Sequence, residues 1–146
     1  MSAAANFTYG WRLGRGITPA IKYLLMINLG VYLLALMVGP GLFSHLFGLS
    51  APAVFSKFKI YQFATYLFVH HGLWHLLLNM FIFWMFGREL ESFWGTAYFV
   101  KYYFITGIGA GLCSLPFIWG KGISVVGASG AIFGLLLAYG LLFPER

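Results

Sequence analysis

The chain has 146 residues, of which 61% are hydrophobic and only 8% charged, and its mean hydropathy is +0.86. Nine basic and three acidic side chains cannot cover that much apolar surface in water, so the composition excludes an ordinary soluble domain and indicates a membrane protein. The formal net charge of +6 is spread along the chain rather than gathered in a basic, aromatic-rich surface, and it therefore gives no indication of a nucleic-acid partner.

Four apolar segments follow one another along the chain. They cover roughly residues 21–38, 73–87, 97–119 and 125–143, and a span needs roughly 20 residues to cross a bilayer. The first stops at Gly39-Pro40-Gly41 without a small-x-small cleavage pattern, so we expect a retained span rather than a signal peptide. Pro116 is expected to end or kink the third segment. These features predict an all-α polytopic membrane protein with four transmembrane helices in a single domain, residues 1–146.

The connection between the first two segments, residues 39–72, is long and mixed in character. It alternates Phe, Leu and Ile with Ser, Lys, His and Gln, which is typical of short amphipathic pieces lying in the headgroup region. We therefore predict a membrane-associated loop there.

The basic residues indicate how the chain is oriented. Three lysines fall on one predicted side of the membrane, and six basic residues fall on the other. The three are Lys57, Lys59 and Lys121, and the six are Arg12, Arg15, Lys22, Arg88, Lys101 and Arg146. Because basic residues favour the cytoplasmic side, this count predicts a cytoplasmic N-terminus.

Polar side chains interrupt two of the apolar segments. His75 and Asn79 are four residues apart and therefore lie on one face of a helix. Ser129 stands between glycines in "GASG", residues 127–130. Taken alone, this glycine-flanked serine is typical of a helix-packing notch, as are Gly130 and Gly134, which are also four apart. Taken with two polar groups on one face of another span, it indicates a hydrated site with a hydroxyl nucleophile and oxyanion donors.

In this combination the chain resembles the rhomboid intramembrane serine proteases. The matching motifs are "HLLLN" (75–79), "GASG" (127–130), the preceding loop "YQFATYLFVHHG" (61–72), "GRELESFWG" (87–95) and "FPER" (143–146). The order and spacing of these motifs carry the resemblance, since each one alone is weak.

The resemblance implies a role for each matching residue. Ser129 corresponds to the catalytic serine, His75 and Asn79 to the side-chain donors of the oxyanion hole, and Gly127 to a glycine that permits close approach of chain and substrate. His70 corresponds to a structural histidine of the loop, and Glu91 to an acidic residue that ties the following connection to its neighbours. The implied substrates are transmembrane proteins within the bilayer, and no metal or organic cofactor is implied.

The chain also departs from the family pattern. Tyr61-Gln62 replaces a common Trp-Arg pair, and Phe133 stands where a tyrosine commonly stacks on the catalytic histidine. The family's general base is a histidine on a sixth helix, and this chain ends after its fourth apolar segment. We therefore expect the four-helix, N-terminal portion of a six-helix core, without the general base and inactive alone.

Several alternatives stay open from the sequence. A non-catalytic rhomboid-like protein that binds membrane clients, or a small transporter, would also be rich in apolar helices. The histidines of "HHGLWH" (70–75) are too few for a membrane di-iron site. Glu89 and Glu91 are expected in a solvated, ion-paired connection with Arg88, and Cys113 is expected in the core. The expected location is a bacterial inner membrane.

Overall fold

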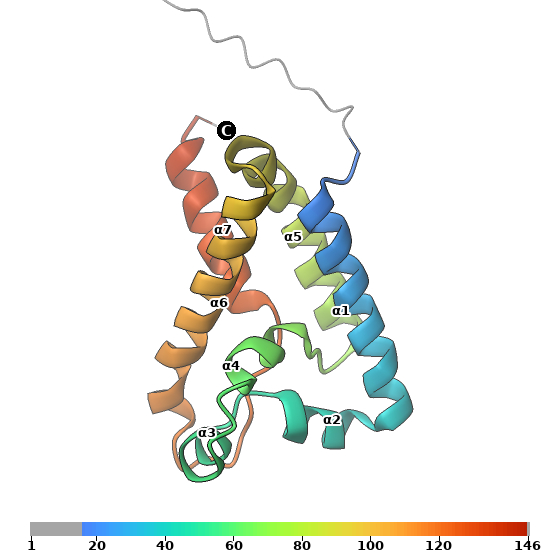
Figure 1. Ribbon diagram of the computed structural model, residues 1–146, viewed down its shortest axis with the longest axis vertical. Coiled ribbons are helices and arrows are strands. Elements are labelled where there is room, and N and C mark those ends of the chain that lie inside the picture. Colours follow the sequence, from blue (N-terminus) through green and yellow to red (C-terminus); the bar gives the residue numbers. More distant parts are fainter. Residues whose placement is uncertain (1–15, 146) are drawn as a thin grey trace, which may run out of the picture.

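The computed structural model describes residues 16–145, which form an all-helical bundle (Figure 1). Its four long helices are α1 (Pro19–Val38), α5 (Leu73–Trp94), α6 (Thr96–Ile118) and α7 (Ser129–Leu142). The predicted all-α fold class is confirmed. Arg12, Arg15 and Arg146, which were counted for the orientation, lie outside the described residues.

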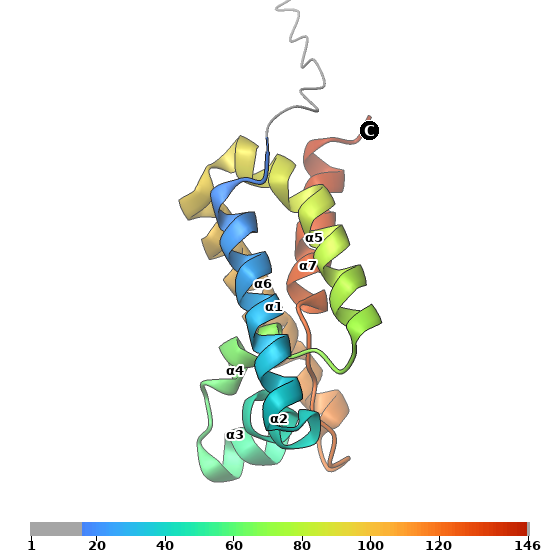
Figure 2. The same cartoon turned by 90° about the vertical axis from the view of Figure 1, so that its right-hand side faces the viewer.

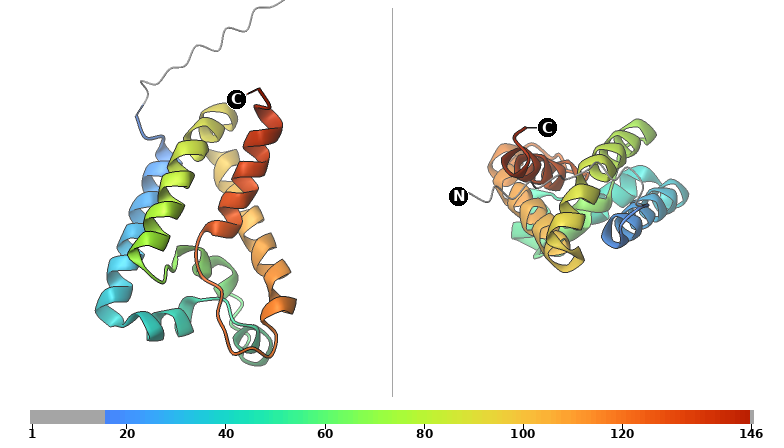
Figure 3. Two further views of the ribbon diagram at one scale, coloured as in Figure 1. Left: turned by 180° about the vertical axis from the view of Figure 1, so that it is seen from behind. Right: turned by 90° about the horizontal axis from the view of Figure 1, so that it is seen from above.

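The long helices pack in a fixed order. Helix α1 lies against α5, α5 against α7, and α7 against α6, an arrangement that Figure 2 and Figure 3 show from the side, from behind and from above. The core between them is aromatic and aliphatic, with Phe83, Phe99 and Tyr103 almost completely buried. By contrast, α1 exposes Tyr23, Met26 and Met37. A helix that is apolar on its outer face as well as its inner face fits a bilayer rather than water.

The long connection folds into short helices at the end of the bundle opposite the C-terminus (Figure 1). They are α2 (Pro40–Phe47), α3 (Ala51–Lys57), α4 (Gln62–Thr65) and the 3₁₀ turn η1 (Tyr66–Phe68). A proline in the first turn starts both α2 and α3, where its missing N–H costs nothing. Together these pieces support the loop that leads into α7.

Two predicted segment boundaries were wrong. The second segment was expected to end at Gly87, but α5 continues to Trp94 and ends at Gly95, which has φ +81°. Gly87 serves packing instead: a Cβ there would lie 2.6 Å from Ile21 Cδ1. The fourth segment was expected from residue 125, but α7 begins at Ser129.

Two further expectations concern α6. Pro116 lies inside the helix, which continues to Ile118, so the proline does not end it at once. Cys113 was expected in the core but is exposed. It lies on a helix whose surroundings are apolar, where a small thiol is as acceptable facing lipid as facing protein.

Length and apolarity identify only part of the bundle as spanning segments. Among residues 16–145, α1 is the one helix long and apolar enough by itself to cross a bilayer. The pair α4–η1 and α5 passes the same test jointly, although it is bent by 97° at the break between them. Helix α7 is apolar but has 14 residues. Four full spans remain a prediction.

Candidate active site

Ser129 is the first residue of α7 and follows a sharp turn. Gly127, two residues earlier, has φ +107°, a backbone conformation that side-chain-bearing residues rarely adopt. The first N–H groups of a helix have no partner within it, and the helix dipole makes that end positive. The start of α7 therefore presents a half-buried hydroxyl beside backbone donors suited to an oxyanion.

The segment before Ser129 is held by the long loop. Val125 and Leu49 exchange two backbone hydrogen bonds, with N···O distances of 2.9 and 2.8 Å. The Gly127 N–H donates to the Tyr66 carbonyl at 2.8 Å. These three bonds explain why the helix does not begin at residue 125: the backbone there is already committed to the loop.

His75 and Asn79 lie against Gly127. A Cβ placed on Gly127 would be 2.8 Å from His75 Cε1, 2.9 Å from His75 Nε2 and 3.7 Å from Asn79 Nδ2. The glycine thus gives the turn its left-handed conformation and leaves room for both side chains. The structure thus brings His75 and Asn79 against Gly127, which is two residues before Ser129.

The hydrogen bonds of Asn79 leave it with a donor to spare. Its side chain is buried, and Nδ2 donates to the His75 carbonyl at 3.0 Å. An amide nitrogen carries two hydrogens. One of them fixes the side chain against its own helix, and the second can be donated to a ligand.

His70 lies beside His75. Their ring centroids are 5.0 Å apart, with an interplanar angle of 62°. His70 is buried, and its Nδ1 lies 3.2 Å from the Phe68 carbonyl, while Nε2 has no hydrogen-bond partner among the described residues. The edge-to-face contact restricts how the His75 ring can turn.

Gly130 and Gly134 lie on the face of α7 that packs against α6. A Cβ on Gly130 would meet Ala110 Cβ at 2.5 Å, and one on Gly134 would meet Thr106 Cβ at 2.5 Å. The Tyr102 hydroxyl donates to the Gly134 carbonyl at 3.0 Å. Small residues here let the two helix backbones approach closely, which fixes the position of the helix that carries Ser129.

Glu91 lies near the other end of α5 and is buried, so the expectation of a solvated, ion-paired connection was wrong for it. Its carboxylate accepts hydrogen bonds from the Thr18 hydroxyl, from the backbone N–H groups of Ala20 and Ile21, and from the Thr96 hydroxyl. It therefore caps the N-terminus of α1 and ties it to the start of α6. The pattern of charged residues along the sequence could not predict these backbone donors.

Arg88, the expected ionic partner, lies over the ring of Trp84, with its guanidinium carbon 4.7 Å from the ring centroid. Glu89 accepts a hydrogen bond from the Tyr139 hydroxyl at 3.1 Å, which joins α5 to α7. Both residues thus lie on a helix, where Arg88 contacts Trp84 and Glu89 contacts Tyr139.

Sequence reasoning missed two supporting residues. Tyr66 accepts from Gly127 through its carbonyl, and its buried hydroxyl donates to the Gly107 carbonyl at 2.5 Å. Gln62, treated only as a departure from the family pattern, is fully buried; it accepts from Ser50 N–H and donates to the Leu46 carbonyl. The feature of the sequence that could have indicated them is the presence of a hydroxyl and an amide side chain in a mainly apolar stretch.

The other two residues at which the chain departs from the family pattern, Tyr61 and Phe133, face outward. Phe133 is 71% exposed, and Tyr61 is also exposed, with its hydroxyl donating to the Leu46 carbonyl at 3.0 Å. Within residues 16–145, no group of three or more His, Cys, Asp or Glu side chains is placed to hold a metal ion.

Comparison with known proteins gives a consistent result. A profile of the Rhomboid domain matches residues 57–146. "Rhomboid-like protein 11, chloroplastic" of Arabidopsis thaliana is 35% identical over 79% of the chain, and "Rhomboid-like protease 3" of Toxoplasma gondii is 36% identical over 59%. "Inactive RHOMBOID-like protein 8" of Arabidopsis thaliana is 29% identical over 68%.

The matches cover only part of these relatives. The chain spans 39%, 32% and 28% of their respective lengths. One is named a protease and another inactive, so similarity alone does not decide between the two. Because all three come from a plant or Toxoplasma gondii, they give no support to the bacterial inner membrane expected above.

Proposed function

Because the chain belongs to the rhomboid family, whose members are membrane proteins, we propose that it carries the nucleophile and the oxyanion donors of an intramembrane serine endopeptidase. The observation that carries the proposal is the packing of His75 and Asn79 against Gly127, two residues before Ser129. A helix-packing notch would require small residues there, but it would not require two polar side chains facing the same turn.

The proposed chemistry is acyl transfer. Ser129 Oγ attacks the carbonyl carbon of a substrate peptide bond and gives its proton to a general base. The carbonyl oxygen takes the negative charge, which the Ser129 N–H, His75 and the spare hydrogen of Asn79 stabilise. Collapse of this intermediate releases the amine half, which takes up the proton, and leaves an acyl ester on Ser129. Water then hydrolyses the ester.

The general base is assigned outside this chain. A serine hydroxyl needs a base within hydrogen-bond reach to act as a nucleophile. The resemblance places that base on a later helix, and it gives His75 the oxyanion role. On this proposal the 146 residues alone hydrolyse nothing measurably.

The proposed substrates are transmembrane proteins in the same bilayer. A substrate helix has its backbone groups bonded internally, so it must unwind locally before a carbonyl reaches Ser129. No cofactor is required by this chemistry. We also propose a multi-pass topology with a cytoplasmic N-terminus, in a membrane whose identity the relatives leave open.

The alternative is a non-catalytic protein that binds membrane clients. It is favoured by the similarity to a relative whose name calls it inactive. That alternative predicts that Ser129 can be replaced without loss of function.

The test is cleavage of a model single-span substrate in proteoliposomes by the protein as expressed from its gene. Ser129→Ala is expected to abolish cleavage and labelling by a fluorophosphonate probe, because no other group supplies the attacking oxygen. Ser124→Ala, in the same segment but facing Gly48, is the matched control and should cleave normally. Cleavage that survives in Ser129→Ala would overturn the proposal, and cleavage by the 146-residue chain alone would place the base within it.

A further inference from the structure

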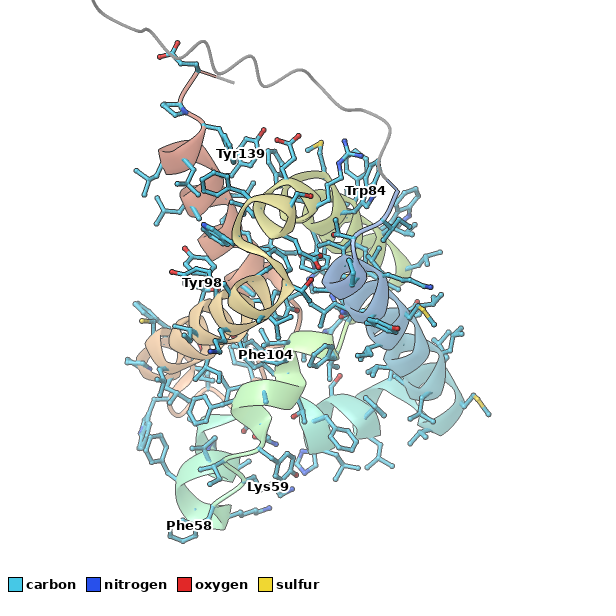
Figure 4. All side chains as sticks on the ribbon, turned by 45° about the horizontal axis from the view of Figure 1, so that its top comes forward. Phe58, Lys59, Trp84, Tyr98, Phe104 and Tyr139 are labelled. Atoms are coloured by element: carbon cyan, nitrogen blue, oxygen red, sulfur yellow. The ribbon has the colours of Figure 1, made fainter. Side chains whose placement is uncertain are left out.

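The end of the bundle formed by α3 and the segment after α6 combines exposed aromatic rings with lysines. We call it the α3-end surface and define it by the following residues: Phe55, Lys57, Phe58, Lys59, Trp119 and Lys121. Phe58 is 81% exposed, and Figure 4 shows it beside Lys59 at the outer edge of the bundle. Phe55 and Trp119 are exposed as well, so the rings form a patch rather than a single exposed side chain, and such a patch indicates contact with something outside the described chain.

Two contacts make this surface a built feature. The rings of Phe55 and Trp119 pack with centroids 4.9 Å apart, which joins α3 to the segment after α6. Phe58 has φ +54°, and Lys59 N–H donates to the Ala53 carbonyl at 3.0 Å. A left-handed conformation is unusual for a bulky residue. The turn therefore holds Phe58 outward between the two flanking lysines.

The charge on this surface is of one sign. The chain has three acidic residues, Glu89, Glu91 and Glu145, and they lie in the last turns of α5 and after α7. Figure 1 shows α3 at the opposite end from the C-terminus. Lys57, Lys59 and Lys121 thus have no carboxylate near them in the described chain.

From this arrangement we infer that the α3-end surface binds the headgroups of anionic phospholipids. Aromatic rings settle at the boundary between headgroups and acyl chains, and lysine stems follow apolar surface while the ammonium group reaches a phosphate. The sequence Lys57-Phe58-Lys59 places a ring between two such groups. An acidic protein segment would satisfy the lysines but would leave the rings between them in water, so lipid is the better fit.

This inference does not depend on proteolysis, and its test reads lipid contact directly. Cys113 is the chain's one cysteine, is exposed, and precedes the end of α6 by about 8 Å along the helix. In the test, a bimane fluorophore is attached to Cys113 and the protein is placed in phosphatidylcholine vesicles. One sample contains a small fraction of nitroxide-labelled phosphatidylglycerol, a parallel sample contains the same fraction of nitroxide-labelled phosphatidylcholine, and the quenching of bimane is measured in both.

The expected result is stronger quenching by the anionic lipid, with an apparent preference of about fivefold per engaged lysine at low salt, falling as salt is added. The triple variant Lys57→Gln, Lys59→Gln, Lys121→Gln should quench equally with both lipids. The control variant Lys22→Gln, Lys101→Gln removes lysines outside this surface and should keep the preference. Helix content by circular dichroism checks that each variant is folded.

Equal quenching in the unmodified chain would overturn the inference, as would a preference that survives in the triple variant. A Glu-rich peptide that abolishes the preference when the anionic lipid is scarcer than the protein would assign the α3-end surface to acidic protein segments instead. That result would also overturn the inference.

Discussion

The two ends of α5 hold polar groups in opposite states. Near the C-terminal end, each carboxylate oxygen of Glu91 accepts two hydrogen bonds, so the acceptor capacity of the group is taken up by the protein itself. Near the N-terminal end, about 18 Å away along the helix axis, Asn79 uses one of its donors on its own helix and retains another. The adjacent start of α7 adds backbone N–H groups without helical partners.

This difference separates structural from chemical roles inside a membrane protein. A buried polar group whose bonds are all made within the chain stabilises the fold and has nothing left for a ligand. Buried N–H donors that have no acceptor within the chain cost folding free energy unless a ligand accepts their hydrogen bonds. The comparison therefore predicts that changes at the Ser129 end lower rate more than stability, and that changes at the Glu91 end do the reverse.

The largest expected effect is on catalysis by Asn79→Ala. Loss of one oxyanion donor should lower kcat/KM by about 10²–10³-fold, with little change in the resistance of the helices to detergent unfolding. The measurement is substrate cleavage in proteoliposomes by the protein as expressed from its gene, together with an unfolding titration in mixed micelles.

Asn28→Ala is the matched control for that variant. Asn28 is also a buried asparagine on a long helix, and its Nδ2 donates to the Leu24 carbonyl, four residues earlier, at 2.7 Å. It lies on α1, away from Ser129, so its loss should affect stability and leave the rate per folded molecule nearly unchanged. Equal losses of rate in both variants would show that Asn79 acts through packing.

The reverse effect is expected from Glu91→Ala. Removing the carboxylate strips the α1 N-terminus of its cap and leaves buried donors unsatisfied, which should cost on the order of 3 kcal/mol of unfolding free energy. Cleavage per folded molecule should stay close to normal. Glu89→Ala, two residues earlier on the same helix, should cost less, because the Glu89 side chain is only partly buried whereas that of Glu91 is buried. A rate loss in Glu91→Ala at full folding would remove the distinction between the two ends.

The hydrogen bonding at the two ends of α5 also explains which of their residues could be predicted from the sequence. His75, Asn79 and "GASG" could be found because polar residues are costly in an apolar segment and their spacing on a helix is fixed. Most of the role of Glu91 could not be derived from its neighbours in sequence, because three of its four donors belong to Thr18, Ala20 and Ile21, seventy or more residues away. The family resemblance alone pointed toward such a tie.

The start of α7 was misplaced for a related reason. Residues 125–128 are apolar or small, so their hydropathy continues the apolar segment, but their backbone bonds go to Leu49 and Tyr66 of the long loop. Pairing between segments so far apart leaves no periodic signal in either one. Hydropathy alone therefore does not show where the helix begins, whereas the low helix propensity of valine and glycine agrees with a start after Gly127, which has positive φ.

The smallest expected effect tests what holds α7 in place between the two ends. Gly134→Ala puts a Cβ 2.5 Å from Thr106 Cβ, and Thr106 is itself held by a hydrogen bond from Oγ1 to the Tyr102 carbonyl at 2.8 Å. Overpacking of this kind should cost about 1–3 kcal/mol. Gly140→Ala, on the same helix with nothing within 4 Å of the new Cβ, should be neutral or stabilise by up to about 1 kcal/mol. Since Ser129 lies on the same helix, a shift of α7 in Gly134→Ala should also lower kcat, whereas Gly140→Ala should not. If both variants unfolded at the same detergent concentration, close packing of α6 on α7 would not be what positions the nucleophile.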